Sequence, residues 1–192
     1  MARDVVYAYS GLAVAGQVLI VAALVVGLLA LAGVRAPLER VRGWLWGYEL
    51  WGAFVVAALA TGGSLFYSQI EHFIPCELCW YQRLLMYPLS ILTLLLAWRG
   101  DYRGARYLLA LPVVGAGVSI YHMLIQYGAI KEPAACSAVI PGLCGTNWIE
   151  PEGFGYLAIP TVALTGFLLL IGFLLLASSG GADEGGLTQA EA

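Results

Sequence analysis

Four cysteines, arranged as two close pairs, are the residues in this sequence whose type and spacing best suit chemistry. Cys76 and Cys79 form a C-x-x-C motif, and Cys136 and Cys144 enclose the segment Ser-Ala-Val-Ile-Pro-Gly-Leu, in which Pro-Gly suits a turn that brings the two sulfurs together. In an oxidising compartment, such pairs form disulfides and exchange them with other thiols. The cysteines therefore predict either redox chemistry or two structural disulfides.

The C-x-x-C motif directly precedes a long apolar stretch that begins near Trp80. A helix that starts there would lower the pKa of a cysteine in its first turn, because unpaired N–H groups and the positive end of the helix dipole favour a thiolate. Haem attachment is excluded, because it requires a histidine directly after the second cysteine, where Trp80 stands. A zinc site made by all four cysteines is disfavoured by the longer spacing of the second pair, and we expect no metal.

Three polar residues inside apolar stretches are candidates for binding a small molecule. Arg83 lies one helical turn after Cys79 on the same face, where it would stabilise a thiolate and polarise an electron acceptor dissolved in the lipid. His122 and Gln126 are one turn apart in a later stretch, at a similar depth, where they would serve as partners for a bound cofactor. The alternatives are structural, with Arg83 reaching lipid headgroups and His122 acting as a packing residue.

The composition places these residues in a membrane. Of the 192 residues, 61% are hydrophobic and only 11% are charged, and the mean hydropathy is +0.84. Continuously apolar stretches cover residues 12–31, 50–67, 80–98, 107–127 and 154–177, each long enough for a transmembrane helix. We therefore predict an all-α integral membrane protein with a four-helix transmembrane bundle core and one additional N-terminal transmembrane helix. A net charge of −3 gives no support for nucleic-acid binding.

The charges between the stretches predict the orientation. Two short connections hold six of the nine basic residues, namely Arg35, Arg40, Arg42, Arg99, Arg103 and Arg106. The positive-inside rule places these connections in the cytoplasm, so both cysteine pairs and the N-terminus face outward. His72 and Glu77 lie in the outer loops, where we expect them to be exposed and to take no part in the site.

Three segments follow from this reading. Residues 1–49 form the extra helix and an interfacial linker rich in aromatic residues, residues 50–177 form the catalytic core, and residues 178–192 form a Gly-rich acidic tail that we predict to be disordered and cytoplasmic.

Three sequence motifs in the predicted core resemble one known family. They are CELCWYQR at residues 76–83, YHMLIQ at 121–126 and WIEPEGFGYLAIP at 148–160, with the second cysteine pair between the last two. Together they resemble the DsbB/BdbC family of disulfide bond formation proteins, over roughly residues 50–177. The resemblance implies a bacterial cytoplasmic-membrane enzyme that reoxidises a thioredoxin-like, DsbA-type protein on the outer side and passes the electrons to ubiquinone or menaquinone.

The resemblance also implies roles for individual residues. Cys79 would lie next to the quinone, with Arg83 assisting it and Cys76 as its disulfide mate, and His122 would contact the quinone. Cys136 would form the mixed disulfide with the partner protein, and Cys144 would exchange with Cys76.

Three alternatives remain open at this point. A vitamin K epoxide reductase homologue also combines four helices, a C-x-x-C motif and two loop cysteines, but in that family the loop pair precedes the motif. A non-catalytic membrane protein would use both pairs as structural disulfides. A relative working in reverse would pass electrons outward, because a sequence does not give redox potentials.

Overall fold

The computed structural model describes residues 2–133, 136, 142–147 and 156–190. Among these residues every regular element is a helix, which confirms the predicted all-α class. The elements are α1 (Ala2–Leu31), α2 (Ala36–Leu45), α3 (Glu49–Leu65), the π-helical turn η1 (Phe66–Ile70), α4 (Glu77–Arg99), α5 (Tyr102–Leu108), α6 (Ala110–Gln126), the 3-10 turn η2 (Leu143–Gly145) and α7 (Ile159–Ala190). Most of the last sequence motif, residues 148–155, lies outside the described part.

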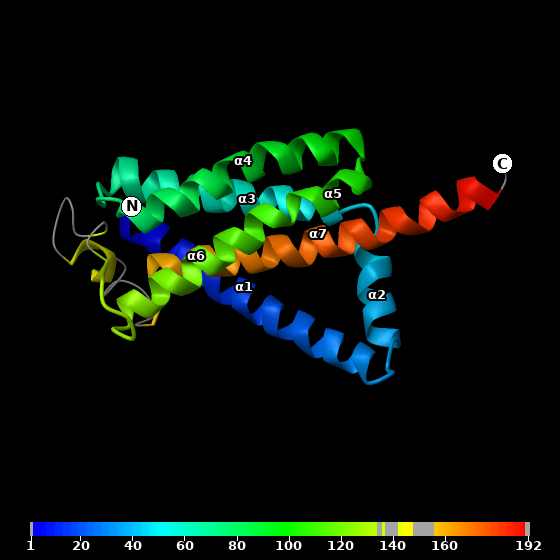
Figure 1. Cartoon of the computed structure of the whole chain (residues 1–192), viewed down its shortest axis with the longest axis horizontal. Helices are drawn as coiled ribbons and strands as arrows, with labels where there is room; N and C mark the ends of the chain where they lie inside the picture. The colour runs from blue at the N-terminus through cyan, green and yellow to red at the C-terminus, as the bar shows by residue number, and fades with distance from the viewer. Residues whose placement is uncertain (1, 134–135, 137–141, 148–155, 191–192) are drawn as a thin grey trace.

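Helices α3, α4, α6 and α7 run side by side as the bundle core (Figure 1). Helix α7 packs against α3 and α6, and its Phe167, Leu170 and Leu174 are completely buried. Glycines allow these close contacts, because a Cβ on Gly115 would lie 2.4 Å from the Phe167 ring. Small residues bring helices together in membranes in this way, where apolar side chains gain little from leaving lipid.

Four segments of the described chain are long and apolar enough to cross a membrane: Asp4–Leu31, Glu49–Ile70, Tyr102–Gln126 and Ile159–Ser179. Helix α4 has 23 residues, which is also long enough, but Gln82 and Arg83 near its start reduce its hydropathy. The predicted fourth stretch comprises two helices, since α5 ends at Leu108 and α6 begins at Ala110, with Pro112 in its first turn. The chain is a multi-pass membrane protein.

Helix α1 has two halves with different surroundings. Toward the N-terminus, Val6, Ser10 and Ala13 are at most 5% exposed because they pack against the bundle. Toward the C-terminus, Leu24 and Leu28 are more than 60% exposed, and the helix diverges from the bundle before it reaches α2 (Figure 1). Helix α1 therefore covers the core only near the end that carries the cysteines.

Two predictions outside the core can be compared with the structure. In the predicted interfacial linker, Trp44 is 84% and Tyr48 69% exposed around α2, as expected of side chains at headgroup level. The sequence predicts a disordered tail from Ser178 onward. In the structure the backbone of α7 continues as helix to Ala190. Leu, Gln and Ala residues in that segment favour helix.

Candidate functional site

The C-x-x-C motif lies at the N-terminus of α4, where the sequence predicts a helix start. Cys76 is the N-cap residue, with extended backbone, and its Sγ accepts a hydrogen bond from the Cys79 backbone N–H at 3.3 Å. The two thiols are 2.6 Å apart from sulfur to sulfur, and Cys76 is 2% exposed. This arrangement lets the pair exchange between a dithiol and a disulfide with little movement of the helix.

The surroundings of Cys76 favour its thiolate. A hydrogen bond from the Cys79 thiol, assisted by His122, lowers the pKa of Cys76 to about 5, although burial opposes the shift. The start of α4 adds the positive end of its dipole. Within the reduced pair, the thiol whose pKa is lowered is Cys76, at the N-cap of α4.

His122 connects the motif to the second cysteine pair. It comes from α6, is 3% exposed, and its Nε2 lies 3.6 Å from Cys76 Sγ and 3.2 Å from the Cys144 carbonyl oxygen. Its Nδ1 lies 3.4 Å from Gln82 Nε2. These contacts fit a neutral ring that donates from Nε2 to Cys144 and accepts at Nδ1 from Gln82.

Gln82 is a site residue that the sequence analysis did not select. It is 5% exposed, and it holds the His122 ring from the side opposite the cysteines. Its position could have been noticed in the sequence, since Gln82 is a polar residue three positions after Cys79 in an apolar stretch. Polar side chains inside a membrane usually have a partner.

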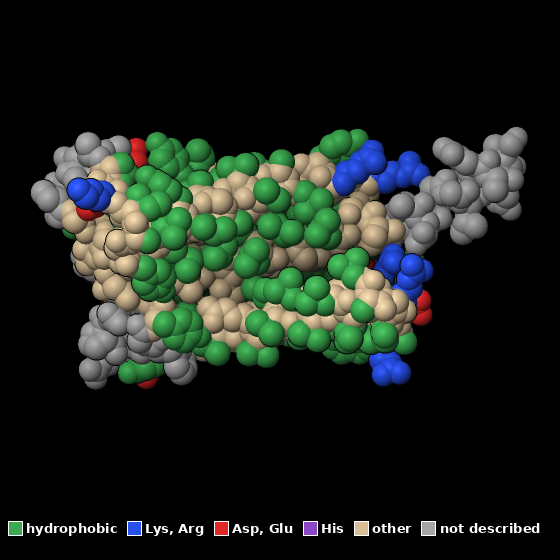
Figure 2. All heavy atoms as spheres, turned by 60° about the horizontal axis from the view of Figure 1, so that its bottom comes forward, with side chains coloured by type: hydrophobic (Ala, Val, Ile, Leu, Met, Phe, Trp, Pro, Cys, Tyr) green, Lys and Arg blue, Asp and Glu red, His purple; other side chains and the backbone are tan. Residues whose placement is uncertain are grey.

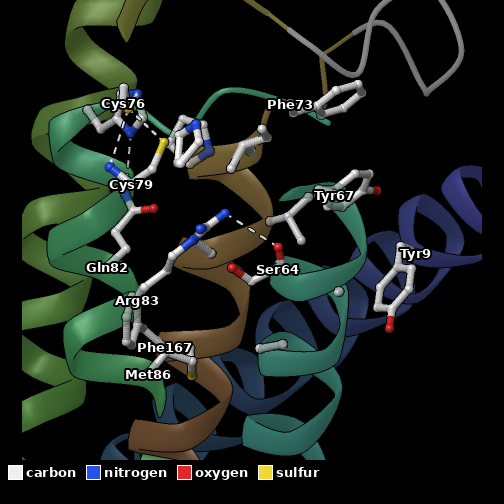
Figure 3. Close-up of a pocket in the computed structure, with 18 of the residues that line it drawn as sticks. Tyr9, Ser64, Tyr67, Phe73, Cys76, Cys79, Gln82, Arg83, Met86 and Phe167 are labelled. Atoms are coloured by element: carbon white, nitrogen blue, oxygen red, sulfur yellow. Dashed lines mark hydrogen bonds between the residues drawn. The ribbon is translucent and has the colours of Figure 1, made fainter. Parts of the chain in front are cut away.

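Arg83 extends from α4 across a pocket toward α3 (Figure 3). Its guanidinium donates to the Ser64 carbonyl oxygen at 3.4 Å and lies 5.3 Å from the centre of the Trp80 ring. Arg83 and Cys79 line the same pocket, as expected from their spacing of one turn. The cation therefore lies beside the motif inside the protein.

The pocket brings together every predicted binding residue. Its wall includes Cys76, Cys79, Gln82, Arg83, His122, Gln126, Ser64, Tyr67, Phe73, Met86, Tyr9 and Phe167. Gln126 donates from Nε2 to the Thr146 carbonyl oxygen at 3.3 Å, and its Oε1 is buried with no partner among the described residues. The wall is mostly apolar, and the Arg83 guanidinium reaches across it from the α4 side, which also carries Cys79 (Figure 3).

The second pair forms a disulfide between Cys136 and Cys144, with Cα atoms 5.9 Å apart. Gly142 supports the predicted turn with a left-handed φ of 82°. The Cys144 N–H donates to Glu132 Oε1 at 2.9 Å. Both cysteines are buried, at 4% and 1% exposed.

The remaining sequence predictions near the site have clear outcomes. His72 and Glu77 are exposed, as expected. The disulfide uses two of the four cysteines, so this structure does not contain the four-cysteine zinc arrangement. A carboxylate oxygen of Glu132 and the sulfurs of Cys136 and Cys144 lie within 4.8 Å of one another, which places an acid beside the loop disulfide.

Two cysteine pairs in contact at one end of a helical membrane bundle, one pair facing a pocket, define a membrane protein of thiol–disulfide exchange. Residues 49–177 match the family model described as "Disulfide bond formation protein DsbB". The chain belongs to this family. Membership of this family implies that the chain is an oxidoreductase that acts on thiols. The match also excludes the vitamin K epoxide reductase alternative.

Similar proteins occur in distant bacteria. Disulfide bond formation protein C of Bacillus subtilis is 42% identical over 131 residues, which cover 66% of this chain and 90% of the relative. A probable disulfide formation protein of Deinococcus radiodurans is 36% identical over 131 residues, covering 66% of this chain and 86% of the relative. One from Coxiella burnetii is 37% identical, covering 68% and 87%. No solved structure matches the chain.

Proposed function

We propose that this protein is a thiol:quinone oxidoreductase that reoxidises a thioredoxin-like, DsbA-type protein and passes the electrons to ubiquinone or menaquinone in the membrane. The observation that carries the proposal is the shared pocket. It places Cys79, Arg83 and His122 around one apolar space, in direct contact with the pair that includes Cys144. One side of the site suits a lipid-soluble acceptor and the other suits a protein thiol.

The first step concerns the loop pair. A thiolate of the reduced partner attacks Cys136 Sγ, so a mixed disulfide forms, the Cys136–Cys144 bond breaks and Cys144 leaves as a thiolate. The same partner's second thiol then resolves the mixed disulfide, or the Cys144 thiolate passes the exchange inward to Cys76. The contact between the Cys144 carbonyl and His122 holds Cys144 beside the motif.

The second step concerns the C-x-x-C pair. Attack of the Cys144 thiolate on Cys76 Sγ breaks the Cys76–Cys79 disulfide and releases the Cys79 thiolate beside Arg83. A quinone supplies the chemistry of accepting two electrons and two protons. The Arg83 guanidinium offsets negative charge on a quinone oxygen, and His122, which hydrogen-bonds Gln82, can exchange a proton at Nε2.

The proposed orientation places this chemistry outside the cytoplasm. Most Lys and Arg side chains gather at the end of the molecule with α2 and the α4–α5 connection (Figure 2). The cysteines lie at the other end (Figure 1). The positive-inside rule then puts the basic end in the cytoplasm of a bacterium and the cysteines on the periplasmic or extracytoplasmic side, where disulfides persist.

The test uses the full chain, purified in detergent. A reduced thioredoxin-like protein is added with ubiquinone or menaquinone, and the quinone absorbance is followed for the wild type and for Cys79→Ser. We expect quinone reduction by the wild type that Cys79→Ser abolishes. Reduction that persists in the variant, or no reduction with either quinone, contradicts the proposal. Quinol oxidation coupled to thiol formation on the partner would show the reverse direction.

A further inference from the structure

Part of the pocket wall comes from residues outside the segment that matches the family model. Residues 49–177 match the family model, yet Tyr9 from α1 lines the pocket together with Gly63 of α3. The aligned segment already covers 90% of the Bacillus subtilis relative, which leaves no room there for another helix of 30 residues. Helix α1 is therefore an addition of this chain to the shared core.

Tyr9 is fitted closely into the bundle. A Cβ on Gly63 would lie 2.6 Å from Tyr9 Cε1, so the ring occupies space that only glycine leaves free. The ring also packs against two aromatic residues of the η1 turn, with centroids 6.4 Å from Phe66 and 6.1 Å from Tyr67. These contacts fix the ring at one place in the wall.

The rest of the outer half of α1 is anchored to α7 and the segment before it. Gln17 donates to Thr165 Oγ1 at 3.4 Å and accepts from the Tyr156 hydroxyl at 2.8 Å. A Cβ on Gly16 would lie 2.9 Å from a Thr165 methyl group, so the two helices touch there. Polar and packing contacts about two turns after Tyr9 thus help to fix its position.

The place of Tyr9 in the pocket indicates what it touches. Figure 3 shows Tyr9 on the far side of Ser64 and Tyr67 from Cys79 and Arg83. A quinone that reacts at Cys79 would need its ring near Arg83, and its isoprenoid tail would then lie along the apolar remainder of the pocket wall, which includes Tyr9. Tyr9 offers a flat apolar ring and no charge, which suits such a tail.

We propose that α1 completes the quinone pocket of this chain and that Tyr9 is a specificity-determining residue for the isoprenoid tail. This inference rests on the proposed function. It assigns Tyr9 to substrate recognition and leaves thiol–disulfide exchange to the core helices. The four helices shared with the relatives then supply the chemistry, and the added helix supplies part of the selectivity.

The test measures quinone binding without turnover, by quenching of tryptophan fluorescence in the oxidised protein. Two probes share one head group, one with a short isoprenoid tail and one without. For Tyr9→Ala we expect the Kd of the tailed quinone to rise about 3- to 10-fold, because an aromatic contact is lost, and that of the tail-less quinone to stay unchanged. The matched control is Tyr7→Ala, since Tyr7 is on the same helix but 53% exposed.

A second variant approaches the same contact from α3. Gly63→Ala should displace the Tyr9 ring and weaken binding of the tailed quinone as Tyr9→Ala does, and the double variant should be no weaker than either single one. Reduction of the Cys136–Cys144 disulfide by a small dithiol should keep its wild-type rate in all of them, which shows that the fold is intact.

Two results overturn the inference while leaving the proposed function in place. One is a wild-type Kd for the tailed quinone in Tyr9→Ala, and the other is an equal weakening of both quinones. If the wild type itself binds neither quinone, the proposed function fails, and the role of Tyr9 fails with it.

Discussion

The two cysteine pairs are held by different kinds of backbone. Cys76 and Cys79 occupy the N-cap and first turn of a 23-residue helix, so their positions follow from the helix itself. Cys136 and Cys144 belong to a loop, where the disulfide, the left-handed Gly142 and the acceptor on Glu132 hold them. The first pair is fixed beside the pocket, whereas the second pair is buried and does not line the pocket as the first does.

The difference teaches how one small chain can serve two unlike reactants. A lipid-soluble acceptor diffuses into a pocket that already exists, so the pair facing it gains from a rigid frame. A folded partner brings its own surface, and in the proposed function the pair that it meets lies in a loop at the end of the bundle. A change to one pair should therefore affect either oxidation of the partner or reduction of the quinone, which are the two half-reactions, more than the other.

Cys136→Ala is expected to separate the two half-reactions most strongly. Loss of the attacked sulfur should reduce oxidation of the thioredoxin-like partner by roughly two orders of magnitude or more, because the loop disulfide that its thiolate attacks can no longer form. Quinone binding should be retained, since Cys136 does not line the pocket. Both quantities are measured on the same preparation, and full partner oxidation by this variant would refute the assignment of Cys136 as the entry point.

A large effect confined to the other half-reaction is expected from Arg83→Ala. The rate of quinone reduction should fall roughly 10- to 100-fold, because charge on the quinone oxygen loses its cation. Reduction of the loop disulfide by a dithiol should not change. Arg99→Ala, at the last turn of the same helix, is the matched control. Unchanged quinone kinetics in Arg83→Ala would assign this arginine to lipid headgroups.

A pH measurement sharpens the contrast between the pairs. Because the pKa of reduced Cys76 is lowered to about 5, its thiolate is present above that pH, and its alkylation rate should rise through about pH 5 and be level at neutral pH. His122→Ala removes one of the groups that lower the pKa, so the midpoint should move upward. Gln126→Ala is the control. Mass spectrometry of the Cys76 peptide gives the rate, and an unmoved midpoint in His122→Ala would exclude this role.

The smallest effect is expected at the loop pair, from Glu132→Gln. The carboxylate lies near both sulfurs and opposes the negative charge that a leaving thiolate acquires. Removing it should speed reduction of the Cys136–Cys144 disulfide by dithiothreitol about 2- to 5-fold. Glu77→Gln, exposed beside the other pair, is the control. A slower reduction would instead make Glu132 a group that promotes the exchange.

The sequence predicts the pocket pair better than the loop pair. The start of α4 and the shared face of Cys79 and Arg83 follow from helix periodicity, so their positions could be foreseen. The contact between His122 and Gln82 joins residues 40 positions apart, and the burial of Cys144 depends on how the loop folds onto α6. Such contacts depend on tertiary packing, which one sequence does not specify. The same holds for Tyr9, whose neighbour Gly63 is distant in sequence.

Phe167 lines the pocket, and the way its ring packs has a consequence for cellular energetics. The ring is wedged against Gly115, and the completely buried Leu89, Leu170 and Leu174 continue the core from there toward the other end of the bundle. Figure 3 shows Phe167 and Met86 below Arg83, on the side of the pocket away from Cys76. In the proposed orientation these buried apolar side chains lie between the site and the cytoplasm. In the proposed reaction, the protons that follow the electrons to the quinone come from the side on which the dithiol releases them, so turnover would move no charge across the bilayer and leave the membrane potential unchanged.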